Sequence, residues 1–250
     1  IERFLYSSSK NIVVFTKSFK KNLILKGVLS NKLHVVINGA NLALFKAPVY
    51  DEDLAMHLDL HDKFVVGYMG TLGLSHDLLN AVHAASLVKD EGIFFLFVGE
   101  GAEKAAMVTL AKQLNATNIR FVERQDREDI PKYWGLCDVG LVHLKNDPVF
   151  ETVIPSKIFE TMASGRPVMY CGPDSDGARL VEMHDCGLSA KSDDPKALAS
   201  QLRVLKRDPV LCTRLATNGK KASSEFSREV QAEGTLAVLQ LTSNTSAVKK

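Results

Sequence analysis

The segment FETVIPSKIFETMASGRPV, from Phe150 to Val168, combines residue types that hold phosphates and sugars. Pro155 suits the first position of a helix, and Gly165 suits the left-handed cap that ends one. The free amides of the first turn and the helix dipole form an anion site, to which Lys157 adds a full charge. Glu160 lies one turn along the same face, within reach of sugar hydroxyls. The pattern indicates a nucleotide-sugar site, although a capped helix with an ordinary Lys157–Glu160 surface pair explains it equally well.

Short apolar segments alternate with amphipathic ones through most of the chain. The predicted strands are Lys63–Met69, Phe94–Val98, Ile119–Val122, Asp138–Leu144, Val168–Cys171 and Gly187–Ala190. This alternation predicts an α/β fold with a doubly wound, Rossmann-like parallel sheet over residues 49–225. Ligands of such sheets bind beyond the carboxyl ends of the strands. The site should therefore be lined by the loops Gly70–Ser75, Gly99–Ala102, Glu123–Arg127 and Leu144–Pro155.

Residues 1–48 belong to a different unit. A strand at Asn11–Thr16, a helix at Ser18–Lys26 and a strand at Leu33–Ile37 resemble the end of a neighbouring α/β domain followed by a linker. We therefore interpret the chain as a fragment. A helix over residues 226–242 is expected to pack back toward that neighbour, and residues 243–250 are expected to form a flexible tail.

Composition excludes several classes of function. The formal net charge is only +2, which gives no electrostatic argument for nucleic acid. The four cysteines are widely spaced and form no CxxC motif, which predicts reduced thiols in a cytosolic protein. No histidine, cysteine or acidic cluster has metal-ligand spacing, and no Gly-x-Ser-x-Gly motif supports a hydrolase. His143, near the end of a predicted strand, is interpreted as a core histidine rather than as a ligand.

Five motifs together resemble a known family. In chain order they are NIVVFTKSFKKNLILKGV, VVINGANLALF, the strand that ends at Gly70, VGEGAEK and PSKIFETMASGRPV. They are similar to the bacterial retaining glycosyltransferases of the GT-B fold, family four, and above all to those that add amino or deoxy sugars during surface polysaccharide synthesis. The resemblance implies two Rossmann-like domains facing each other across a cleft. This chain would be the C-terminal, donor-binding half, without the bulk of the acceptor domain.

The resemblance also implies roles for individual residues. Glu160 would hold the ribose hydroxyls and Lys157 the diphosphate, which makes these two residues the catalytic candidates. The diphosphate and sugar would be wrapped by Ile154, Pro155, Ser156 and Lys157, and faced across the cleft by Gly70, Thr71 and Gly73. Arg124 and Gln125 lie where the family holds the base. Gly99 and Gly101 would allow close approach of a loop, although any tight strand-to-helix turn needs such glycines.

Two departures from the family pattern concern charge. Many members have an arginine directly after the first-strand glycine and a lysine five residues later, where this chain has Thr71 and His76. Lys157 is then the main cation for the phosphates, unless Arg124 or Arg166 turns inward. The family's paired glutamates are usually separated by seven residues, whereas eight separate Glu151 from Glu160. Glu151 is therefore a weaker candidate, and a backbone amide near Val153 or Ile154 is an alternative for its sugar contact.

The resemblance thus implies transfer of a sugar from a UDP-type donor to a lipid-linked saccharide acceptor, in lipopolysaccharide or capsule biosynthesis. The enzyme would be cytoplasmic, with peripheral attachment to the inner face of the cell membrane as a further expectation. It would need neither a cofactor nor a metal, and this fragment alone would be inactive without the missing N-terminal domain. Two alternatives remain open: a sugar-nucleotide epimerase of the same fold, and a non-catalytic nucleotide-sugar-binding module.

Overall fold

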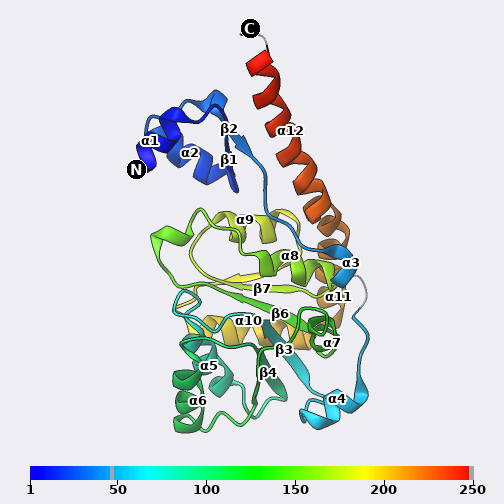
Figure 1. The fold of residues 1–250 in the computed structure, drawn as a ribbon. Helices are drawn as coiled ribbons and strands as arrows, with labels where there is room; N and C mark the ends of the chain where they lie inside the picture. Colours follow the sequence, from blue (N-terminus) through cyan, green and yellow to red (C-terminus); the bar gives the residue numbers. More distant parts are fainter. Residues whose placement is uncertain (46–47, 248–250) are drawn as a thin grey trace.

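The computed structural model describes residues 1–45 and 48–247. Its main part is a parallel six-stranded sheet with strand order β5-β4-β3-β6-β7-β8 (Figure 1). The strands are β3 (Phe64–Met69), β4 (Ile93–Val98), β5 (Ile119–Val122), β6 (Val139–His143), β7 (Val168–Cys171) and β8 (Gly187–Ala190). The order reverses between β3 and β6, which gives the topological switch point of a doubly wound fold. The predicted fold class and all six strands are confirmed.

Helices cover both faces of this sheet. One face packs against α5 (Leu78–Leu87), α6 (Lys104–Gln113), α10 (Pro195–Arg207) and α11 (Pro209–Ala222). The other packs against α7 (Ile130–Gly135), α8 (Ser156–Ala163) and α9 (Asp176–Met183). Along β3, Val66 and Tyr68 face the first set, whereas Val65 and Met69 face the second. Because both faces are buried, the strands are continuous apolar runs rather than alternating ones.

The first residues form a separate small unit. It consists of α1 (Glu2–Ser8), α2 (Lys17–Leu25), a 3-10 turn η1 (Ser30–Lys32) and a two-stranded parallel sheet of β1 (Ile12–Val14) and β2 (Leu33–Val35). Its core is small, with Val14, Leu23 and Leu33 buried. Two short helices, α3 (Leu42–Phe45) and α4 (Glu52–His57), lie between this unit and β3.

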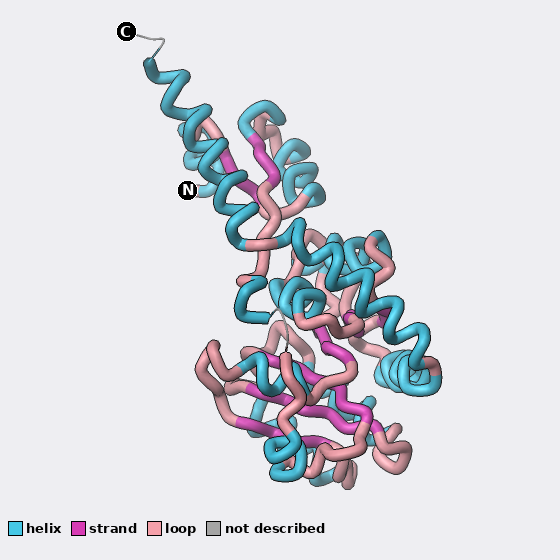
Figure 2. The backbone as a smooth tube through the Cα atoms, turned by 90° about the vertical axis from the view of Figure 1, so that its right-hand side faces the viewer, coloured by secondary structure: helices cyan, strands magenta, loops and turns pink. Residues whose placement is uncertain are grey.

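The last helix, α12 (Arg228–Ala247), returns to this N-terminal unit, as both views show (Figures 1 and 2). It follows the 3-10 turn η3 (Ser223–Phe226). Ala40 forms a parallel bridge with Ser227 where the helix begins, and the Asn11 side chain donates a hydrogen bond to the Thr242 hydroxyl at 2.7 Å farther along. The helix thus contacts the N-terminal unit at both of these points.

The segment 243–250, expected to form a flexible tail, begins within the last helix. Helix α12 continues through residue 247, while residues 248–250 lie outside the described part of the chain. Polar residues such as Ser243 do not interrupt it, and the Ser243 hydroxyl donates to the Gln240 carbonyl at 2.9 Å.

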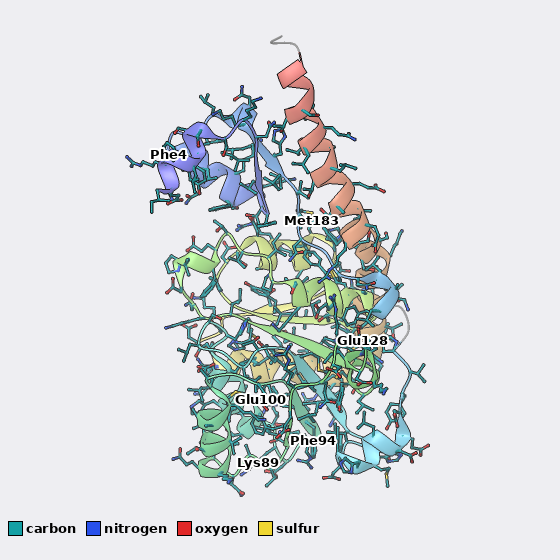
Figure 3. The ribbon with its side chains drawn as sticks, viewed as in Figure 1. Phe4, Lys89, Phe94, Glu100, Glu128 and Met183 are labelled. Carbon is teal, nitrogen blue, oxygen red and sulfur yellow. The ribbon has the colours of Figure 1, made fainter. Side chains whose placement is uncertain are left out.

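Large apolar side chains stay exposed on both parts of the molecule. Phe4 on α1 and Met183 on α9, both labelled in Figure 3, are 71% and 75% exposed. Among the described residues, no helix combines the length and apolar character that crossing a membrane requires.

Candidate functional site

A cavity of about 590 Å³ opens at the carboxyl ends of β3, β4 and β5. This is the edge at which doubly wound sheets bind their ligands. Seven of the predicted site residues line it: Gly70, Thr71, Gly99, Gly101, Arg124, Gln125 and Glu160. They come from three strand-to-helix loops and from α8, so the fold brings together segments that lie up to ninety positions apart in the chain.

The loops after β3 and β4 are hydrogen-bonded to each other. Gly70 donates its amide to Val98 at 2.9 Å, and Leu72 donates to Glu100 at 2.8 Å. A Cβ atom on Gly99 would collide with the Gly70 carbonyl, and one on Gly101 with the Leu72 carbonyl. These glycines therefore serve close packing between two loops, which is the structural explanation that the sequence left open. Glu100, labelled in Figure 3, lies between them and lines the cavity.

Helix α8 begins one residue later than predicted. Pro155 has an extended ψ of 136° and is the N-cap, with its carbonyl accepting a hydrogen bond from the Ile158 amide at 3.1 Å. Its φ of −63° suits the N-cap and the first helical position alike, which is why the sequence pattern did not separate them. Ser156 and Lys157 are therefore the first two helical residues. Pro155 offers no side-chain cap, so their amides keep the anion-binding character expected of a helix start.

Lys157 lies against the loop that follows β3. A Cβ atom on Gly70 would come within 2.8 Å of the Lys157 Cε and 3.0 Å of its Nζ. The ammonium also lies 5.0 Å from the centre of the Tyr68 ring, within cation–π range. Burial lowers the pKa of Lys157, although the nearby Glu160 carboxylate opposes this shift. The side chain is thus a partly desolvated cation beside the cavity.

Glu160 is half-buried and lines the cavity itself. Burial raises the pKa of this carboxyl, and the charges of Lys157, Arg127 and Arg228 only partly offset that effect. Both Lys157 and Glu160 are half-buried, which an ordinary solvated surface pair does not predict. Both residues hold charge in surroundings that disfavour it, a property that functional sites share.

Two histidines stabilise the loop that leads from β3 to α5. The Nδ1 of His143 lies 2.6 Å from the His76 carbonyl, and the Nδ1 of His76 lies 3.1 Å from the His143 carbonyl. Because a carbonyl can only accept, both Nδ1 atoms carry the proton. His143 is 1% exposed, which confirms it as a core residue, and burial lowers its pKa to about 4. Burial and the charge of Lys157 also lower the pKa of His76.

Several predicted residues lie outside this cavity. Glu151 is exposed, and its carbonyl accepts a hydrogen bond from the Asp176 amide at 3.0 Å. Ile154 lines a smaller cavity between the loop before α8 and the N-terminal unit. Gly73 is half-buried and packs near its neighbour Thr71. Of the two arginines considered as inward cations, Arg124 lines the main cavity and Arg166 does not.

Other residues that were not singled out from the sequence also line the cavity. Phe45, Met69, Val98 and Ile130 lie outside the loops predicted to form the site, whereas Glu100, Asp126 and Arg127 lie within two of those loops. Arg127 is the most important of them, since its charge acts on Glu160. The charged run ERQDRED after β5 was the available signal for it. Phe45 carried no such signal, because it belongs to the segment assigned to the linker.

A family model for glycosyl transferases group 1 matches residues 49–222, which contain every strand of the sheet and all of the cavity except Phe45. The chain belongs to the group 1 glycosyltransferases. A curated relative from Escherichia coli (strain K12), WcaI, bears the name of a colanic acid biosynthesis glycosyl transferase. It is 31% identical over 159 residues, which is 62% of this chain and 39% of that protein.

A second relative comes from Campylobacter jejuni and is named as the N,N'-diacetylbacillosaminyl-diphospho-undecaprenol alpha-1,3-N-acetylgalactosaminyltransferase. It is 25% identical over 221 residues, covering 86% of this chain and 55% of that protein. The chain thus spans about two fifths to about half the length of these relatives. A solved structure of Anabaena Alr3699/HepE in complex with UDP and glucose superimposes with a TM-score of 0.75, at 17% identity, over 96% of this chain and 63% of that one. That similarity confirms the GT-B fold, of which the six-stranded sheet is the C-terminal Rossmann-like domain.

Proposed function

We propose that residues 49–225 form the donor-binding domain of a retaining glycosyltransferase that moves a sugar from UDP to a lipid-linked saccharide during surface polysaccharide biosynthesis. The family membership and the names of the two relatives support this proposal. UDP as the nucleotide part of the sugar donor is supported by the ligand named for the structurally similar Anabaena protein. The acceptor would be held at the cytoplasmic face of the membrane by its lipid, and the rest of the acceptor site would come from a larger N-terminal domain.

The observation that carries the proposal is the placement of Lys157 and Glu160 on successive turns of α8. Lys157 reaches the Gly70 loop, and Glu160 enters the cavity. In both residues burial shifts the pKa against the charged form. A bound nucleotide sugar would compensate both groups, since its diphosphate pairs with the ammonium and its ribose hydroxyls donate to the carboxylate.

Within this site we assign each part of the donor to a segment of the chain. The base lies against the loop after β5, at Arg124 and Gln125, and the ribose lies against Glu160. Lys157 and the first amides of α8 contact the diphosphate and stabilise the charge that develops on it as the sugar departs. This is electrostatic preorganisation and needs no proton transfer from α8. We propose that it also needs no metal, because the ammonium and amides supply the positive charge.

Calorimetric titration of the chain with UDP, UMP and uridine tests the proposal. We expect saturable binding in the order UDP, then UMP, then uridine, because each phosphate adds contacts to α8. A UDP-sugar panel then identifies the donor by its thermal stabilisation of the chain. Absence of binding by every nucleoside diphosphate would overturn the proposal. In the longer protein, product formation that depends on an added acceptor distinguishes a transferase from an epimerase, and donor binding without any turnover would identify a sensing module.

A further inference from the structure

A second cavity, of about 680 Å³, opens at the other end of the sheet. Phe64, Asp138 and Pro167 mark its position, because they stand at the amino ends of β3, β6 and β7. Leu205 of α10 and Cys212 of α11 close its other side. None of the residues assigned to the nucleotide sugar lines this rear cavity, so the donor site does not explain it.

Two buried polar atoms of the rear cavity have no hydrogen-bond partner in the described part of the chain. They are the hydroxyl of Ser164, a residue only 4% exposed, and the Nε of Arg166. One guanidinium NH2 group of Arg166 donates to the Gly135 carbonyl at 3.3 Å, which helps to fix the side chain. An unsatisfied buried group costs about 1–3 kcal/mol, so two of them in one cavity call for an explanation. Both can donate, so an acceptor-rich guest would satisfy them.

The charges around the rear cavity favour an anion. Within residues 1–45 and 48–247, neither Arg166 nor Lys220 forms an ion pair. Lys206, at the rim, donates to the Glu91 carbonyl. The carboxylate in the lining, Asp138, accepts a hydrogen bond from the Val65 amide at 2.7 Å. Burial raises its pKa, and the charge of Arg166 partly opposes this shift, so Asp138 is one negative charge beside three cations of the lining. The lining thus carries an excess of positive charge.

The C-terminus of α8 does not require these cations. Two of its last carbonyls already have partners, because the Gly165 amide donates to Met162 at 3.0 Å and the Arg166 amide donates to Thr161 at 3.2 Å. This is the Schellman arrangement, with Gly165 at a φ of +65°. Lys220 lies across Gly165, with its Cδ 3.4 Å from the position of an added Cβ. Helix capping therefore leaves the side chains of Ser164, Arg166 and Lys220 available to a ligand.

We propose that the rear cavity binds the phosphate group of a small phosphate monoester, at a site separate from the donor cleft. The Ser164 hydroxyl, the Arg166 guanidinium and the Lys220 ammonium would bind the phosphoryl oxygens. These donors come from two separate elements, which suits a tetrahedral dianion better than a flat carboxylate. The organic part of the ligand would lie against the apolar side chains of Phe64 and Leu205.

Phenyl phosphate is the test ligand, because it combines the anion with a small apolar ring. Calorimetric titration should give saturable binding, with weaker binding of inorganic phosphate and of benzoate. Arg166→Gln and Lys220→Gln should each weaken the binding of phenyl phosphate at least about ten-fold, as expected for the loss of a charge-assisted hydrogen bond. Lys221→Gln is the matched control, since this exposed neighbour does not line the cavity and its variant should bind like the wild type.

The donor cleft is also expected to bind phosphates, so the titration is repeated with saturating UDP and with the Lys157→Ala variant. Phenyl phosphate should still bind in both cases. Displacement by UDP, an unchanged affinity in Lys220→Gln, or equally tight binding of benzoate would overturn the proposal. Lys220 is exposed, so its variant remains informative even if Arg166→Gln fails to fold. Binding of phenyl phosphate without any binding of UDP would reject the proposed function and leave the rear site standing.

Discussion

The carboxylate of Asp176 accepts hydrogen bonds from the Ser18 amide at 3.1 Å and from the Ser18 hydroxyl at 2.7 Å. Ser18 lies in the first turn of α2, where free amides and the helix dipole attract an anion. The first residue of α9 thus closes the start of a helix in the N-terminal unit. Nearby, the Thr16 hydroxyl donates to the Thr152 carbonyl at 2.8 Å. The N-terminal unit is therefore bonded directly to the loop that leads into α8.

Removing this carboxylate should loosen the contact between the two parts. We expect Asp176→Ala to lower the free energy of unfolding by about 1–3 kcal/mol, because several hydrogen bonds to a charged group are lost. Amide hydrogen exchange at Ser18 should become faster. Asp174→Ala is the control, since Asp174 is largely exposed and pairs only with Arg179 among the described residues; it should change the free energy by less than about 0.5 kcal/mol. Equal effects of the two variants would contradict the assignment.

The pH dependence of this contact follows from the pKa of Asp176. Burial raises that pKa, but hydrogen bonds from the Ser18 side chain, from Arg179 and from the Ser18 amide outweigh burial and hold it below its ordinary value. A carboxyl with a depressed pKa stabilises the folded state above its unfolded pKa of about 3.9, and this contribution is lost as the pH falls through the lower folded value. The difference between wild type and Asp176→Ala, measured by urea unfolding, should therefore persist at pH 5 and shrink only below about pH 4.

Glu160→Gln should separate binding from stability. The variant loses a charged partner for the ribose hydroxyls, so UDP should bind about ten- to a hundred-fold more weakly, corresponding to roughly 1–3 kcal/mol. Because burial raises the pKa of Glu160, its ionised form destabilises the fold at neutral pH, and the amide should unfold at an equal or higher temperature. Calorimetric titration and thermal unfolding of the same preparation check both statements. If this variant binds UDP with wild-type affinity, Glu160 does not contact the ribose.

His143 should make the protein sensitive to mild acid. Its pKa is about 4 in the fold and about 6.5 when unfolded, so the unfolded state takes up a proton first as the pH falls. Stability is then complete above about pH 6.5 and decreases by about 3 kcal/mol as the pH falls to about 4. His76 contributes in the same direction, because its pKa is also lowered.

The variant His143→Asn tests this assignment. The asparagine amide can still donate to the His76 carbonyl but does not titrate. Urea unfolding at pH 7.5 and at pH 5 should therefore show a smaller loss of stability in the variant than in the wild type. The same loss in both proteins would mean that other groups cause the acid sensitivity.

The fold was predictable because its strands are buried on both faces. Segments such as FVVGYM and FFLFV contain hardly any polar residue, and glycines mark their ends, so the strands, the fold class and the binding edge followed from pattern alone. The start of α8 was misplaced by one residue because proline adopts the same φ at the N-cap and the first helical position. The extension of helix α12 past its predicted end was not expected, because its last residues are mostly serine, threonine and asparagine, which have modest helix propensity.

The site was predictable where one short segment carries it and less so where loops meet. Lys157 and Glu160 share a helix, so their spacing alone placed them together. The approach of Arg127 to Glu160 depends on the path of the loop after β5, which no local pattern describes. The exposure of Glu151 depends likewise on the turn before α8. Burial was missed as well, because sequence spacing does not show how much protein covers a helix face.

Lys157 should contribute an unusually large part of the affinity for the diphosphate, because Thr71 and His76 stand where the family resemblance led us to expect cations. Lys157→Ala should weaken the binding of UDP about ten- to a hundred-fold. It should weaken the binding of uridine much less, since the nucleoside offers no phosphate to the ammonium. Lys104→Ala is the control for charge alone, because Lys104 pairs with Glu100 at the rim of the same cavity. Its effect on UDP should be small.

A second substitution tests whether Lys157 and the loop after β3 bind the same phosphates. Thr71 is exposed, lines the cavity and follows Gly70, over which the Lys157 side chain lies. An arginine at this position can reach the same phosphate oxygens, so Thr71→Arg should restore part of the UDP affinity in the Lys157→Ala background. It should not restore uridine binding. Equal losses for UDP, UMP and uridine in Lys157→Ala would instead mean that the lysine supports α8 and its loop through packing, and the diphosphate would then depend on the helix amides alone.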